Sequence, residues 1–183
     1  MFFSVVLWPL FSVCLWQQPR VNPDAKLVQE FNKRVNEYLT LHKKLESTLP
    51  ALPKDATPQQ MDVHERALGK LVQENRTGAK PGDLFTAEMQ AFVRRLLGDV
   101  FRGPDGRQIK RSILDESGER AGVKLQVNGR YPDEVPVSTV PPQVLLSLPK
   151  LPEELEYRFV GHQLVLLDVH AHTIADFVEN AFP

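Results

Sequence analysis

Three polar side chains near the C-terminus have the types and spacing of a metal site, namely Asp168, His170 and His172. Side chains two residues apart on an extended strand point to the same side, so these three would converge there. Neutral imidazoles are good zinc ligands. Asp168, His170 and His172 are therefore candidate metal ligands, and a small metal-dependent hydrolase is one function that the sequence allows.

The stretch that contains them, VLLDVHAHT, resembles the first strand of the amidohydrolase superfamily, in which an H-x-H pair binds a catalytic metal ion. Those enzymes take their other ligands from later strands of a barrel of about 250 residues, but only residues 173–183 follow here. Further ligands would have to come from His42, His64 or carboxylates whose distance the sequence does not specify. The alternative interpretation places these polar residues at a strand-to-helix junction, with Asp168 as a helix cap. It predicts no catalytic residue and no cofactor.

The rest of the chain offers weaker signals of chemistry. A locally basic stretch between residues 94 and 111 has little aromatic interleaving, and the net charge is −1, so we expect no nucleic-acid partner. The acidic pairs at 133–134 and 153–154 sit in proline-rich loops without a spacing that acid–base catalysis demands. A phosphate-binding glycine loop and a G-x-S-x-G motif are both absent from the sequence.

The segment LEYRFVGHQLVLLD, residues 155–168, predicts a β-hairpin. Gly161 suits the positive φ of a type II′ turn, and a two-residue loop would place Phe159 opposite Leu164. The run of four apolar residues 164–167 indicates a strand that is covered on both faces. That same run is equally compatible with a three-residue loop, so the register stays open at this point.

Apolar residues at three- and four-residue spacing predict helices over about 24–48, 58–76 and 84–102. Asn22 or Asp24 can cap the first helix, Thr57 with Gln60 forms a capping box for the second, and Thr86 can cap the third. A short helix over 107–116 is compatible with the sequence. Helices of this kind pack as a hairpin or a small bundle.

The C-terminal half has a different pattern. Alternation over residues 123–127 predicts a half-buried strand, and the prolines between 132 and 152 predict an edge or an extended segment. Ile174, Phe177, Val178 and Ala181 are spaced as in a short C-terminal helix. We therefore expect a single α+β domain over 19–183, with a helical half (about 23–103) packed on a small, mostly antiparallel sheet in a β-rich half (about 120–183).

The N-terminus predicts export. Residues 2–16 carry no charge, and this run is shorter than the roughly 20 residues of a membrane span. It fits a signal peptide over residues 1–18, with an uncleaved anchor or a lipoprotein acylated at Cys14 as alternatives. Cys14 is the only cysteine, so the chain can form no internal disulfide. The expected location is periplasmic or secreted, with membrane contact only through this N-terminal segment.

Three segments are similar to parts of uncharacterised exported proteins of soil-type bacteria such as acidobacteria: VNPDAKLVQEFNKRVNEYLTLHKKLE, VPPQVLLSLPKLPEELEYRFVGHQLVLLDV and IADFVENAF. The resemblance implies export and a bacterial source, and it implies no activity or site. We favour a non-enzymatic binding or structural module that contacts an envelope protein or a second copy of itself. The helical hairpin or the proline-rich edge would form the contact surface.

Overall fold

The computed structural model describes residues 22–117, 124–133, 135–136 and 138–182. The predicted signal peptide and Cys14 lie outside the described residues. No helix within the described ranges combines the length and apolar character that a membrane crossing requires.

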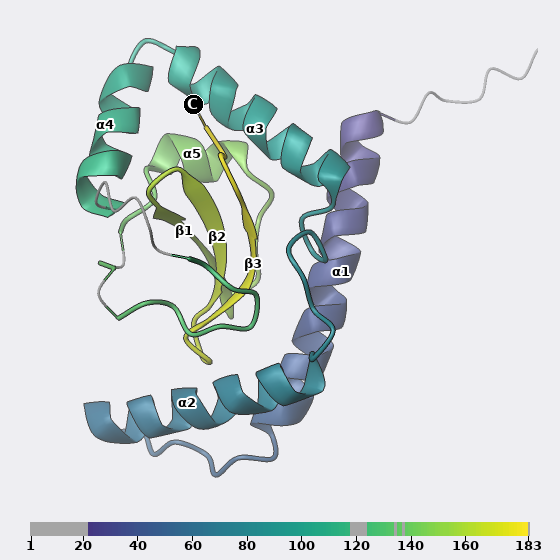
Figure 1. Cartoon of the computed structure of the whole chain (residues 1–183), viewed down its shortest axis with the longest axis vertical. Helices are drawn as coiled ribbons and strands as arrows, with labels where there is room; N and C mark the ends of the chain where they lie inside the picture. Colours follow the sequence, from purple (N-terminus) through teal and green to yellow (C-terminus); the bar gives the residue numbers. More distant parts are fainter. Residues whose placement is uncertain (1–21, 118–123, 134, 137, 183) are drawn as a thin grey trace, which may run out of the picture.

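The described residues form five helices and one three-stranded sheet (Figure 1). The helices are α1 (Pro23–Glu46), α2 (Pro58–Asn75), α3 (Ala87–Arg102), α4 (Gly106–Ser117) and α5 (Pro142–Ser147). The strands are β1 (Leu155–Val160), β2 (Gln163–Asp168) and β3 (Thr173–Val178), in the order β1-β2-β3. The predicted α+β architecture, with an N-terminal helical region packed on an antiparallel sheet, is confirmed.

Local capping explains where the first three helices begin. The Asn22 side chain accepts a hydrogen bond from the Asp24 amide at 3.0 Å. Thr57 and Gln60 form both bonds of the capping box, and the Thr86 hydroxyl accepts the Met89 amide. Each of these side chains satisfies an amide that has no partner within its helix. The caps predicted from the sequence are confirmed.

The hairpin has the register of a two-residue loop. Leu155, Tyr157 and Phe159 pair with Asp168, Leu166 and Leu164, respectively, and Gly161 has a φ of +55°. Every β2 residue from Leu164 to Asp168 is buried, because the strand is covered on both faces. The predictions of a hairpin and of a doubly covered return strand are confirmed.

The predicted C-terminal helix is wrong, since residues Thr173–Val178 form β3 beside β2. All six residues of this strand are buried, so its apolar residues do not alternate as they would on a half-exposed strand. A β-bulge also interrupts the two-residue alternation of β3. Leu166 pairs with Asp176 while Leu167 pairs with Ile174, which leaves Ala175 as the extra residue. The resulting pattern imitates helical spacing.

The predicted strand over residues 123–127 is also wrong in the part that is described. Residues 124–127 form no ladder with the sheet, and Arg130 makes an isolated bridge to Thr173. Leu125 is nevertheless buried against the sheet. Its alternation with polar neighbours reflects one-sided burial of an extended segment and not strand pairing.

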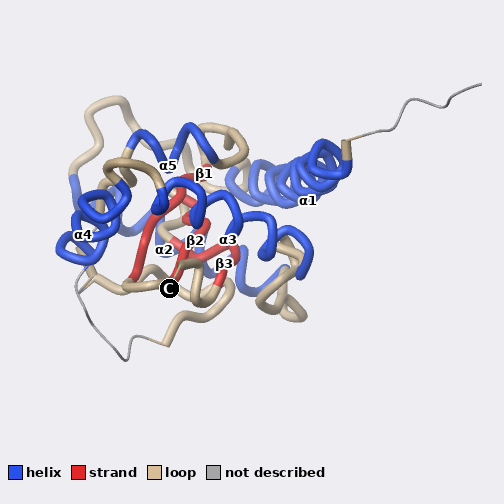
Figure 2. Tube along the Cα trace, turned by 90° about the horizontal axis from the view of Figure 1, so that it is seen from above, coloured by secondary structure: helices blue, strands red, loops and turns tan. Residues whose placement is uncertain are grey.

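The sheet separates two hydrophobic cores. The larger one lies between one sheet face and the helices, and it includes Phe31, Phe85, Leu97, Phe159 and Leu166. The smaller one lies on the other face, beneath the extended segment that carries Leu125, Tyr131 and Val135. Figures 1 and 2 show the helices arranged around the sheet, with this segment running across it before α5.

Candidate functional site

The site is centred on Asp168, the last residue of β2, whose side chain is completely buried. Its Oδ2 accepts hydrogen bonds from the Tyr38 hydroxyl at 2.5 Å and from His42 Nδ1 at 2.6 Å. Its Oδ1 accepts the backbone amides of His170 at 3.1 Å and Ala171 at 2.9 Å. One carboxylate therefore joins α1 to the turn between β2 and β3.

Helix α1 brings three polar side chains to this point. Tyr38, His42 and Glu46 follow one another at intervals of four residues, so they lie on one face of the helix. Helix α2 also approaches the turn closely at Gly69, where an added Cβ would lie 2.9 Å from the Thr173 methyl group. The absence of a side chain at Gly69 therefore allows α2 to lie against the start of β3.

The protonation of the two α1 groups follows from burial and from Asp168. Burial, together with the charge of Asp168 and the hydrogen bond to it, raises the pKa of the Tyr38 hydroxyl well above its usual value. Tyr38 is therefore a hydrogen-bond donor at physiological pH. Burial lowers the pKa of His42, but the hydrogen bond to Asp168 and the charges of Asp168 and Glu46 outweigh it, so that the pKa is raised.

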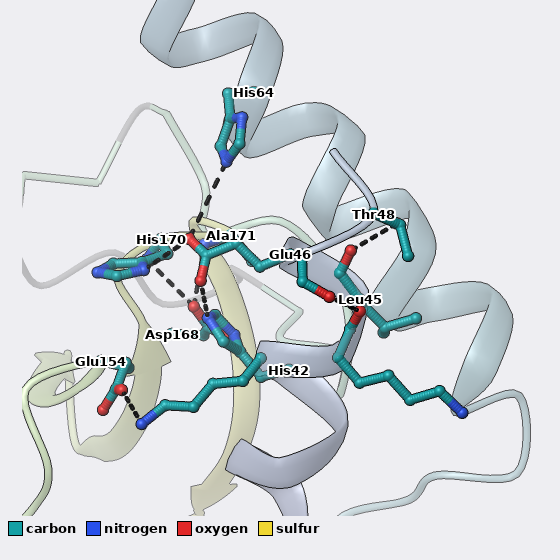
Figure 3. Close-up of polar contacts among 12 residues, drawn as sticks. His42, Leu45, Glu46, Thr48, His64, Glu154, Asp168, His170 and Ala171 are labelled. Carbon is teal, nitrogen blue, oxygen red and sulfur yellow. Dashed lines mark hydrogen bonds and ion pairs between the residues drawn. The ribbon is translucent and has the colours of Figure 1, made fainter. Parts of the chain in front are cut away.

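A second layer of contacts surrounds Glu46, the last residue of α1. Its carboxylate oxygens lie 3.4 Å from His42 Nε2, 3.0 Å from His170 Nδ1 and 4.0 Å from His64 Nε2 (Figure 3). His42 is fully buried, whereas the His170 side chain is 43% exposed. Three imidazoles from α1, α2 and the β2–β3 turn thus point to one carboxylate near the surface.

The sequence-predicted ligands are not the set that the fold brings together. Asp168 and His170 are neighbours, but both oxygens of Asp168 are already engaged with α1 and with the turn. His172 has a φ of +48°, and its ring packs edge-on against Tyr131 at 5.8 Å on the side of the smaller core. Among the residues that the structure describes, the group whose donor atoms converge is His42, Glu46 and His170.

The sequence analysis named His42 only as one source of further ligands, and it gave Tyr38 and Glu46 no role in the site. A signal was present, because three polar or polar-tipped residues at four-residue spacing run along the apolar stripe of α1. A charged or hydrogen-bonding residue on a buried helix face requires a partner elsewhere in the fold. The spacing alone could not indicate that this partner is Asp168.

Three of the other charged candidates form ion pairs or hydrogen bonds with parts of the chain that are distant in sequence. Glu154 accepts the Lys43 ammonium at 2.7 Å, and this hydrogen bond lowers the pKa of Glu154. In the basic stretch, Arg95 pairs with Asp24 at 2.8 Å, and Arg94 donates to backbone carbonyls at residues 179 and 180. These contacts join α1 to the hairpin and α3 to the chain terminus.

Two cavities of about 430 Å³ each open beside the histidine cluster, at the corner between α1 and α2. They share four lining residues: Leu49, Ala51, Leu52 and His64. One extends along α2 and is mostly apolar, while the other includes Lys43 and Glu46. His64 therefore lies between an apolar cavity and the carboxylate that gathers the imidazoles.

Comparisons of the chain with protein-family models, with curated proteins and with solved structures find no match.

Proposed function

We propose that this chain is a non-enzymatic binding module whose ligand occupies the apolar cavity at the α1–α2 corner. The observation that carries the proposal is the cavity itself, whose volume of about 430 Å³ is in the range of small-molecule and side-chain sites. Its lining is dominated by apolar groups and prolines: Leu49, Pro50, Ala51, Leu52, Pro53, Val63 and Ala67, with Gln59, Gln60 and His64 as the polar members.

The exposure of large apolar side chains around this cavity supports the proposal. Among the lining residues, Val63 is 61% exposed and Leu52 is 41% exposed. An apolar surface that gathers around a concavity is typical of a binding surface. The occupant that fits is an apolar small molecule or an apolar side chain of a protein partner, held by burial and oriented by the polar groups at the rim.

The chemistry of Asp168 also favours binding over catalysis by the predicted hydrolase set. A catalytic carboxylate needs an oxygen that can reach the substrate or its water. Each carboxylate oxygen of Asp168 accepts two hydrogen bonds from within the fold, and the Asp168 side chain is fully buried. Asp168 is therefore best understood as a group that holds α1 and the β2–β3 turn in place.

A cavity-filling substitution tests the proposal. Ala67→Trp in α2 places a large ring in the cavity, and we expect it to weaken binding of the apolar probe 1-anilinonaphthalene-8-sulfonate by about tenfold or more. The matched control is Ala91→Trp on the exposed side of α3, which should leave probe affinity unchanged. Probe fluorescence titrations of the two variants and of the parent chain give the result. Equal affinity for all three would contradict the proposed site.

Export stays a prediction that rests on the apolar run of residues 2–16 and on the resemblance to exported bacterial proteins. The intact mass of the chain recovered outside the cytoplasm tests it, because signal-peptide cleavage removes that run. Recovery of the full mass from the cytoplasm alone would contradict it.

A further inference from the structure

We propose that His42 Nε2, the Glu46 carboxylate and His170 Nδ1 together bind one divalent transition-metal ion of the zinc class. This inference is independent of the apolar ligand proposed above. It differs from the site expected from the sequence, because His172 and Asp168 are not ligands and because α1 supplies two of the three donor groups.

The three donor atoms lie close enough together to surround one ion. One donor atom from each of the three side chains lies within 4.8 Å of the other two. A tetrahedral ion with ligands at about 2.0–2.1 Å has neighbouring ligand atoms about 3.3 Å apart. Glu46 Oε2 lies 3.4 Å from His42 Nε2, and Glu46 Oε1 lies 3.0 Å from His170 Nδ1, so the two carboxylate oxygens each face one imidazole at close to that edge length.

The hydrogen bond from His42 to Asp168 leaves the other ring nitrogen of His42 available as a ligand. Its Nδ1 donates to Asp168 at 2.6 Å, so in the neutral ring the lone pair is on Nε2. That nitrogen is buried and has no hydrogen-bond partner within the described part of the chain, although the Glu46 carboxylate lies 3.4 Å away. A lone pair that faces a carboxylate is unfavourable, and either a proton or a metal ion on Nε2 removes the conflict, so zinc would compete with a proton for this nitrogen.

Hydrogen bonds to Asp168 hold the proposed ligands in place. Metal-bound imidazoles generally donate their other ring nitrogen to a carboxylate, which fixes the tautomer and makes the ligand more basic. Asp168 makes this bond to His42 and is itself fixed by Tyr38 and by the amides of His170 and Ala171. The same carboxylate therefore orients one proposed ligand and the turn that carries the other.

The donor set selects the class of ion. Two imidazole nitrogens and one carboxylate suit zinc and its neighbours, whereas calcium and magnesium require oxygen ligands. Three protein ligands leave a fourth position of a tetrahedral ion open. Of the three proposed ligands, Glu46 lines the adjacent cavity of about 430 Å³, together with His64.

A matched pair of substitutions tests the site. We expect one Zn²⁺ per chain in calorimetric titrations of chelator-treated, untagged protein carrying Cys14→Ser, which removes the only thiol. His170→Asn should weaken zinc binding by about 100-fold or more, since even supporting residues around a metal contribute 10–100-fold. Glu46→Gln should weaken it similarly. The control His172→Asn should bind zinc as the parent does, and asparagine tolerates the positive φ at that position.

A second measurement keeps the test independent of folding. In the metal-free state the His170→Asn and His172→Asn variants should unfold at the same denaturant concentration as the parent, because both side chains are partly exposed. One equivalent of zinc should shift the His42 Nε2 resonance of the parent and leave that of His170→Asn largely unchanged. Equal loss of zinc in both variants, substoichiometric binding, or no binding would overturn the proposal.

Discussion

Replacing Asp168 with alanine is expected to lower the free energy of unfolding by about 3–5 kcal/mol, the cost typical of removing one partner from a buried charged network. The Tyr38 hydroxyl and His42 Nδ1 would lose their acceptor in a place where water is excluded. The amides of His170 and Ala171 would lose theirs as well. A folded protein of this kind is stable by about 5–15 kcal/mol, so this loss is a large part of the total.

Urea unfolding curves of parent and variant measure the effect directly. Asp55→Ala is the control, because Asp55 is exposed in the α1–α2 connection, and it should change stability by no more than about 0.5 kcal/mol. Tyr38→Phe removes one donor and keeps the packing, so an intermediate loss of about 1.5–3 kcal/mol is expected for a hydrogen bond to a charged group. If Asp168→Ala were as stable as Asp55→Ala, the carboxylate would not have the structural role described.

Asp176 in β3 is expected to have an effect of the same size through a different part of the fold. Its buried carboxylate accepts the amides of Gly82, Leu84, Phe85 and Phe177 at 2.8–3.1 Å. Burial raises the pKa of this carboxyl, and the amide donors oppose that shift by stabilising the ionised form. The carboxylate is thus the anchor of the connection between α2 and α3.

Asp176→Ala should therefore cost about 3–5 kcal/mol, because it leaves buried amides without an acceptor. It should also accelerate amide hydrogen exchange at Leu84 and Phe85, whose side chains belong to the larger core. Phe85 stacks on Phe31 of α1 at 5.2 Å, so loosening of this connection would weaken the docking of α1.

Asp83→Ala in the same connection is the matched control. The Asp83 carboxylate accepts the local Lys80 amide at 3.0 Å, and its backbone carbonyl, which the substitution keeps, accepts the Arg34 guanidinium at 3.1 Å. It should leave exchange at Leu84 and Phe85 close to that of the parent. A uniform acceleration across the whole molecule in Asp176→Ala, with no larger effect at these two amides, would contradict a local anchor.

The parts of the fold that the sequence predicts are those decided by local chemistry. Thr57 and Gln60 form the predicted capping box, because both partners lie within one helical turn. Gly161 gives the predicted hairpin loop, because a short connection fixes the register of its strands. Each of these features depends on residues that are close together in the sequence.

The parts that the sequence does not predict depend on contacts across the fold. Asp176 pairs opposite Leu166 after a bulge, and the buried strand around it has helical apolar spacing, so periodicity alone indicated the wrong element. In the site, Tyr38 and His42 meet Asp168 across 130 and 126 residues of sequence. No local rule connects positions so far apart, so the sequence indicated His172 and did not indicate that Glu46 lies beside His170.

Asp168 accepts the Nδ1–H of His42, and this hydrogen bond directs Nε2 of the ring at Glu46. Nitrogen-15 NMR of the metal-free protein at alkaline pH, where the imidazole is neutral, reports which ring nitrogen carries the proton. The structure predicts a slowly exchanging proton on Nδ1 and an unprotonated Nε2. A proton on Nε2, with Nδ1 bare, would contradict both the role of Asp168 and the metal site built upon it.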